Sequence, residues 1–113
     1  MFTIARGDLV YIPFPNQEGP GFTVRLCIVL DNSCRMVDLV PCTKSTHQDW
    51  RYDKCFIIKK DSPEGLAMKL AHDSLIIVDR NESFPERLVQ SKHRGGVTPE
   101  SILKKIEDMM DEL

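Results

Sequence analysis

The spacing of hydrophobic residues changes once along this chain, and that change constrains the fold more than any other feature. Over most of the chain, short runs of β-branched, aromatic and aliphatic residues alternate with turn-forming residues at intervals of roughly ten. Near the end, Ile102, Ile106, Met109 and Leu113 recur every three or four positions, which is the period of an amphipathic helix. The pattern predicts a mostly β domain that ends in one helix at about 99–113.

The β region contains five clear runs and a weaker sixth, which together predict a small antiparallel barrel or half-barrel whose open side the helix covers. A chain of 113 residues fits a single domain, here 1–113. Thr98 is the expected N-cap of the helix, and Pro99 suits its first turn. The predicted strands are 8–14, 24–30, 35–41, 52–60, 74–78 and a short one near 87–91, with turns or loops at 31–33, 43–49, 61–65 and 79–83.

Charge and cysteine usage narrow the class of protein. A net charge of −2 argues against a polycation that coats DNA or an anionic membrane. The sequence has no apolar stretch long enough to span a membrane and no secretory signal, so we expect a cytoplasmic protein. Three of the four cysteines lie in strand-like apolar runs and fit buried free thiols, although a disulfide framework remains an alternative. No Cys/His spacing has the form of a zinc site, and we expect neither a metal nor another cofactor.

The order of short motifs resembles the MazF/PemK family of toxin endoribonucleases from toxin–antitoxin systems. The resemblance begins with Arg-Gly-Asp-Leu-Val-Tyr-Ile-Pro-Phe-Pro, continues through a Gly-rich loop and a strand entered by Arg25, and then reaches Val-Pro-Cys-Thr-Lys. It ends with Leu-Ala-His-Asp-Ser-Leu-Ile-Ile-Val-Asp and a basic Gly-containing segment before the helix. These motifs lie at 6–15, 24–30, 40–44, 70–79 and 92–96.

The resemblance implies an SH3-like barrel of five to six strands plus one packing helix, and a homodimeric toxin that inhibits growth by cleaving single-stranded RNA without a metal. It also implies a cognate antitoxin protein that occupies the RNA groove. The residues that carry the family chemistry correspond here to Arg25 and Thr43. Leu26 stands where the family often has Pro, and Gly19 and Pro20 stand where many members have a His-Glu pair.

The chemistry of the residues themselves allows the same function. The guanidinium of Arg25 could hold a phosphate with two hydrogen bonds, or it could be an ordinary surface charge. Thr43 opens a loop whose hydroxyl and ammonium groups suit RNA phosphates, or it forms a plain polar turn; Lys44 and Ser45 belong to the same loop. Trp50 and Arg51 could stack on unpaired bases, or Trp50 could pack in the core or in a dimer interface.

Three residues are candidates for proton transfer. His47 is the histidine closest to the Thr43 loop, and an imidazole can exchange a proton near neutral pH. Glu18 and Asp79 are candidate bases, and each could equally be a solvated loop carboxylate. His72 and His93 have weaker claims because they lie far from this loop in the sequence.

Two other classes of function stay open. The barrel could have lost its catalytic set, as the missing His-Glu pair suggests, and bind RNA or a protein partner instead. The partner could be gyrase, because CcdB toxins share the barrel and act through the end of their C-terminal helix, and this helix has an acidic end at 107–112. A translation-associated barrel module ranks last, because such modules are usually more basic.

Overall fold

The chain folds as one antiparallel sheet with a helix across its open side, as the hydrophobic spacing predicts. A computed structural model describes residues 3–16 and 19–111. The strands run in the order β4-β5-β3-β2-β1-β7, and β6 pairs separately with β3. The strands are β1 (Asp8–Pro15), β2 (Phe22–Ser33), β3 (Met36–Thr43), β4 (Cys55–Ile58), β5 (Ser74–Ile77), β6 (Glu82–Pro85) and β7 (Ser91–Val97).

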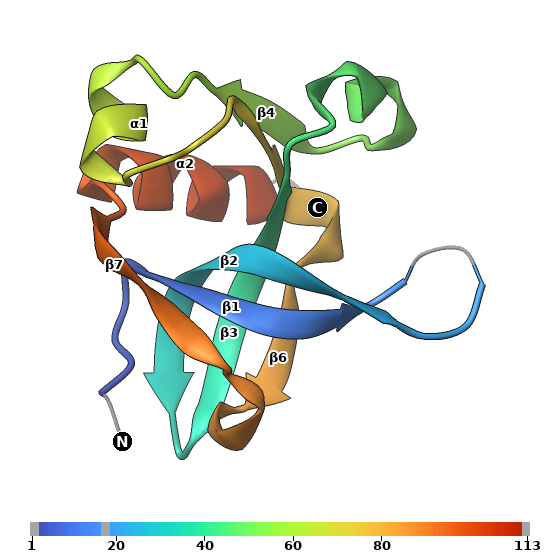
Figure 1. The fold of residues 1–113 in the computed structure, drawn as a ribbon, viewed down its shortest axis with the longest axis vertical. Helices are drawn as coiled ribbons and strands as arrows, with labels where there is room; N and C mark the ends of the chain where they lie inside the picture. The colour runs from blue at the N-terminus through green and yellow to red at the C-terminus, as the bar shows by residue number, and fades with distance from the viewer. Residues whose placement is uncertain (1–2, 17–18, 112–113) are drawn as a thin grey trace.

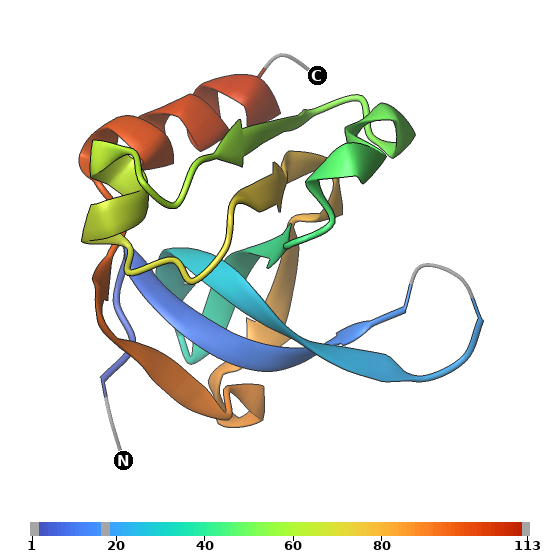
Figure 2. The same ribbon diagram turned by 45° about the horizontal axis from the view of Figure 1, so that its top comes forward.

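The sheet bends around β3, which is shared between three partners. One edge of β3 pairs with β2 as far as Pro41. Its other edge pairs first with β6, up to Leu39, and then with β5, at Cys42 and Thr43. The strand path begins at β4 and ends at β7 without closing, so the architecture is the half-barrel form of the prediction. Figures 1 and 2 show α2 (Glu100–Met110) lying beside β4 and the short helix α1 (Pro63–Ala67).

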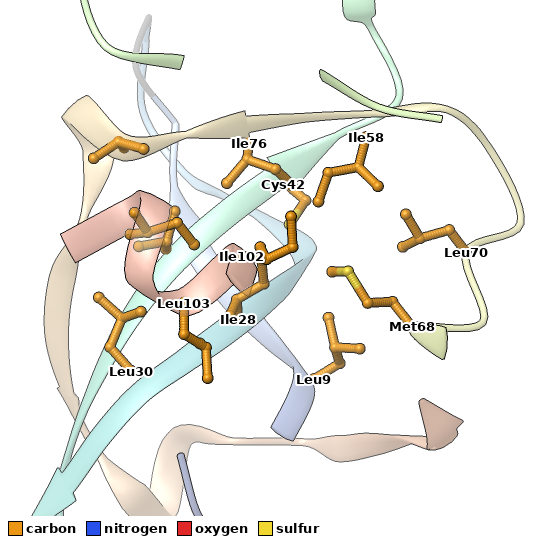
Figure 3. Close-up of a cluster of buried hydrophobic side chains, with 13 residues drawn as sticks. Leu9, Ile28, Leu30, Cys42, Ile58, Met68, Leu70, Ile76, Ile102 and Leu103 are labelled. Atoms are coloured by element: carbon orange, nitrogen blue, oxygen red, sulfur yellow. The ribbon is translucent and has the colours of Figure 1, made fainter. Parts of the chain in front are cut away.

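Two clusters of buried side chains hold the sheet together. The first joins α2 to the sheet through Ile102, Leu103 and Ile106, which pack with Ile28 and Val40 (Figure 3). The second lies on the opposite face. Its buried members are Ile4, Val10, Ile12, Phe14, Cys27, Val29, Val37, Leu39 and Phe84. Because β-strand side chains alternate between faces, membership of these clusters also indicates which face each neighbouring residue occupies.

The acidic end of α2 has partners on other elements. Glu107 accepts two hydrogen bonds from the Arg6 guanidinium, at 2.9 and 2.7 Å. Arg6 also bonds Glu100 and the carbonyl of Leu30, so one guanidinium ties the helix to β2. The Nζ of Lys54 donates to the carbonyl oxygen of Met109 at 2.6 Å, which satisfies a carbonyl in the last turn of the helix.

Several local predictions are wrong in detail. The β2–β3 turn lies at Cys34 and Arg35, which both have positive φ, and β2 runs through the expected 31–33 turn. β6 begins within the expected 79–83 loop and continues to Pro85, and the last strand begins at Ser91 rather than near 87. Pro99, not Thr98, is the N-cap of α2, and the 61–65 turn continues into α1 with Ser62 as its N-cap.

The predicted 43–49 loop contains a 3-10 helix, η1 (Thr46–Arg51). Cys27, Cys42 and Cys55 lie in β2, β3 and β4, as their apolar sequence context predicts. Burial raises the pKa of the Cys42 thiol to about 12 and also raises that of Cys27, so both thiols remain protonated at neutral pH. Among the described residues, no helix is both long and apolar enough to span a membrane.

Candidate nucleic-acid interface

Arg25 and Thr43 lie at the same place on the sheet. Arg25 is two residues before Cys27 on β2, Thr43 is two residues after Pro41 on β3, and Cys27 pairs with Pro41. Continuing this register sets Arg25 opposite Thr43. Cys27 and Leu39 both belong to the second core cluster, so alternation along each strand puts Arg25 and Thr43 on the same face.

Two hollows meet at this pair, and both residues line both of them. The polar hollow has a volume of about 280 Å³, and Asn16, Ser45 and Tyr52 complete it together with Gln48 and Arg51. The apolar hollow has a volume of about 320 Å³. Its walls include Tyr11, Val24, Leu26, Leu70, His72 and His93. Arg25 and Thr43 therefore form a rim between two concave surfaces.

Among the described residues, the Arg25 guanidinium has no competing partner at the rim. The side chain is half-buried, and within the described part of the chain no hydrogen bond or ion pair engages it. This differs from Arg6, which four hydrogen bonds hold in place. A guanidinium with unused donors at a concave rim is suited to bind a phosphate through two parallel hydrogen bonds.

The hydroxyl of Thr43 accepts one hydrogen bond within the protein and still has its own hydrogen to donate. Its Oγ1 accepts a hydrogen bond from the backbone N–H of Ser45 at 3.2 Å, as in an ordinary polar turn. Because this bond uses a lone pair, the hydroxyl hydrogen remains able to donate to an oxygen at the rim. The turn and the phosphate contact are therefore compatible roles for the same side chain.

The remaining candidates fall into three groups. Lys44 lines the apolar hollow, and Ser45 and Arg51 line the polar hollow, where Arg51 donates to Gln48 Oε1 at 3.3 Å. His47 is exposed on η1 and Asp79 is exposed near β5, and neither lines the two hollows. Glu18 lies outside the described residues.

The Asp79 carboxylate bonds the backbone of the segment that precedes β4. Its Oδ2 accepts a hydrogen bond from the backbone N–H of Lys54 at 3.0 Å, and its own N–H donates to the carbonyl of Lys54. These bonds join the start of η2 (Val78–Arg80) to the segment before β4. The carboxylate therefore has a structural position, away from the rim.

Trp50 does not pack in the core. It is 80% exposed at the end of η1, next to Arg51 and the polar hollow. Phe22 and Val24 on β2 are also exposed, at 68% and 52%. Aromatic side chains presented to solvent beside cationic groups can stack on unpaired bases.

Two features of the site escaped sequence analysis. Tyr11 and His93 are 82 positions apart, yet the hydroxyl of Tyr11 lies 2.9 Å from Nδ1 of His93 at the wall of the apolar hollow. Asn16 enters the polar hollow because its amide bonds Pro20 and Thr23 across the β1–β2 hairpin. The pairing of β1 with both β2 and β7 creates these contacts, and no local pattern signals them.

Comparison with solved structures identifies the fold. Chains in two crystal forms of the MazE–MazF complex from Deinococcus radiodurans superimpose on this chain with TM-scores of 0.66 and 0.65, each at 15% identity. The matches cover 99% and 98% of this chain, and 96% and 95% of those chains. No protein-family profile and no curated protein matches the sequence. The chain therefore has a MazF-like fold, which confirms the architecture that the sequence motifs imply.

Proposed function

We propose that this protein is a toxin endoribonuclease of the MazF type, which cuts single-stranded RNA without a metal ion and is neutralised by an antitoxin. The observation that carries the proposal is the convergence of Arg25 and Thr43 at a rim between two hollows, with the guanidinium free of protein partners among the described residues. A further argument is charge. The chain has 17 acidic residues, yet no described residue that lines either hollow is acidic.

The proposed reaction needs only groups that side chains supply. The ribose 2′-oxygen attacks the adjacent phosphorus and loses its proton to a base, while the bond to the 5′-oxygen breaks and that oxygen gains a proton. The products are a 2′,3′-cyclic phosphate and a 5′-hydroxyl. Arg25 stabilises the negative charge that develops on the phosphoryl oxygens, and the Thr43 hydroxyl donates a hydrogen bond to one of them.

Binding of the RNA uses the surroundings of the rim. Lys44, Ser45 and Arg51 offer ammonium, hydroxyl and guanidinium donors to neighbouring phosphates. Trp50 offers a flat surface for an unpaired base, which is the form of RNA that such a site selects. Asp79 takes no direct part in this proposal, because its carboxylate bonds the Lys54 backbone away from the rim. His47 and Glu18 stay the candidates for the acid and the base.

The fold similarity also suggests which partners to propose. The matching chains come from complexes of MazE with MazF, and we propose that this chain likewise assembles as a homodimer and binds an antitoxin across its rim in the cytoplasm. The gyrase alternative has less support, because Glu107 at the acidic helix end is bonded to Arg6.

The test is cleavage of unstructured RNA by the purified protein in EDTA. We expect cuts that leave cyclic phosphate ends, and no cut where the nucleotide 5′ to the scissile bond lacks its 2′-hydroxyl. Arg25→Ala should reduce the rate by about 10³-fold. Thr43→Ala should also reduce it strongly, with both variants as stable as the parental protein.

Matched substitutions outside the rim serve as controls. Arg87→Ala and Thr3→Ala change exposed residues that line neither hollow, and both should cut at the parental rate. Parental rates for Arg25→Ala and Thr43→Ala would refute the assignment of these residues. RNA binding without cleavage by the parental protein would instead identify a binding module.

A further inference from the structure

The wall of the apolar hollow includes the hydroxyl of Tyr11, which a chain of hydrogen bonds holds in place. The Tyr11 hydroxyl lies 2.9 Å from Nδ1 of His93, and Nε2 of His93 lies 2.7 Å from the carbonyl oxygen of Lys69. The two rings meet edge to face, with centroids 5.8 Å apart. Both side chains are partly buried, so this chain of hydrogen bonds holds the phenol in one orientation.

The chemistry of the chain fixes the direction of each hydrogen bond. A carbonyl oxygen only accepts, so Nε2 of His93 must carry the proton that is donated to Lys69. In the neutral imidazole, Nδ1 is then the acceptor, and the Tyr11 hydroxyl donates to it. The phenol oxygen is left with lone pairs for the hollow and no proton to give. Tyr11 therefore presents an acceptor.

The rest of the hollow suits a flat, largely apolar ring. Leu26, Leu70 and Val24 supply hydrocarbon surface, and the volume of about 320 Å³ is at the small end of ligand pockets, which span about 300–1,000 Å³. Arg25 and Lys44 are its cationic lining residues, and Arg25 also lines the polar hollow. An apolar slot with an acceptor in its wall and a phosphate-binding rim beside it matches the parts of a nucleotide.

We propose that the apolar hollow is a nucleobase subsite in which the Tyr11 oxygen accepts a hydrogen bond from an N–H at the edge of the base. This inference rests on the proposed RNA-cleaving function and adds a determinant of sequence preference to it. His93 acts as a positioning residue, because it contacts Tyr11 rather than the base. Unpaired RNA can place successive bases on opposite sides of a phosphate, and here the two hollows flank the rim.

The test is a cleavage-preference profile on a pool of unstructured RNAs that are randomised around the cut. The parental protein should favour, at one position, bases whose edge turns an N–H toward Tyr11. Tyr11→Phe keeps the ring and removes the oxygen, so the preference at that position should fall by about tenfold while preferences at other positions persist. Thermal unfolding of the variant verifies that the fold is unchanged.

His93 provides the second arm. His93→Ala should weaken the base preference at the same RNA position, because the Tyr11 phenol loses the group that orients it. His93→Asn should restore part of the preference, because the asparagine oxygen can accept from Tyr11 near the place of Nδ1. A purely structural role for His93 would change the rate at all sites equally, and would leave the preference profile unmoved.

The outcomes separate the subsite from the nuclease. If the parental protein cuts RNA and Tyr11→Phe has the same preference profile, the subsite is refuted and the nuclease proposal stands. If the parental protein cuts no RNA, both fail together. A profile that changes at every position in Tyr11→Phe also contradicts the subsite, because one lost acceptor should affect one base.

Discussion

The two ends of the β2–β3 hairpin carry opposite kinds of surface. At one end, Arg25 and Thr43 form the rim between two hollows without an acidic residue among their described linings. At the other end, a hollow of about 250 Å³ is lined by Asp31, Asp38 and, from neighbouring elements, Glu82 and Glu107. A chain with a net charge of −2 can thus offer a cationic site to a polyanion, because its acids are gathered elsewhere.

The two arginines of these regions show the same contrast. Arg6, which binds Glu107 beside the acidic hollow, has all its strong contacts within the protein, whereas Arg25 has none among the described residues. The hydrogen bonds to Glu107 and Glu100 raise the pKa of Arg6 further above its already high value. A saturated guanidinium contributes to the fold, and an unsaturated one is available for a ligand.

Replacing Arg25 by lysine should give the largest effect that this contrast predicts. Lysine keeps the charge and loses the two-pronged geometry, so we expect cleavage to fall by about 10²-fold with the free energy of unfolding unchanged within about 0.5 kcal/mol. Cleavage kinetics and urea unfolding measure the two quantities. Arg87→Lys is the matched control, and a fully active Arg25→Lys would show that charge alone suffices.

Trp50→Ala should weaken RNA binding without affecting the fold. Stacking of one base on an aromatic ring contributes about 1–3 kcal/mol, so affinity for a non-cleavable single strand should fall by about fivefold to a hundredfold. Trp50 is 80% exposed, so thermal unfolding should not change. A loss of stability in this variant would show that Trp50 packs against something, such as a second subunit.

Arg6→Ala should lower stability and leave RNA cleavage unchanged, which is the reverse of what we expect for Arg25 and Trp50. We expect a loss of about 1 kcal/mol in unfolding free energy, because Glu107, Glu100 and the Leu30 carbonyl lose a partner that is 36% exposed and screened by solvent. RNA cleavage should remain at the parental rate. Lys104→Ala removes a more exposed lysine that pairs with Asp108 and should cost less.

The smallest predicted effect is the loss, at low pH, of the stability that Glu107 contributes. Hydrogen bonds from Arg6 lower the pKa of the Glu107 carboxyl, so its contribution to stability is present above the pKa of the unfolded chain and is lost as the pH falls through the lower folded value. The difference in unfolding free energy between the parental protein and Glu107→Gln should be below about 1 kcal/mol at pH 6. It should shrink at pH values below about 4.5. A difference independent of pH would contradict the pairing.

The sequence predicted what depends on local pattern. Strands β1, β3 and β5 follow from β-branched runs, and α2 follows from the spacing of Ile102 and Ile106. β6 escaped prediction because Glu82-Ser-Phe-Pro has little strand character, and the free edge of β3 provides its pairing. The β2–β3 turn was misplaced because Cys34 and Arg35, which are not typical turn residues, adopt positive φ.

The candidate site also combines residues that the sequence predicts with residues that it does not. Arg25 and Thr43 could be proposed together because each sits in a recognisable motif, and the β2–β3 register then brings the motifs side by side. Tyr11 and His93 could not, because their contact depends on β1 pairing with β7 across most of the chain. Local sequence predicts contacts between strands that follow each other in the chain far better than the contacts of β7, which pairs with β1 from the other end of the chain.

Thr98, at the junction between β7 and α2, is a position where a substitution should raise the stability of the fold. Its hydroxyl oxygen is buried and has no hydrogen-bond partner among the described residues. Water would satisfy that oxygen in the unfolded chain, so the native state forfeits an interaction there. Valine has nearly the same shape without the hydroxyl. A more heat-tolerant scaffold is therefore accessible through one residue that touches neither hollow.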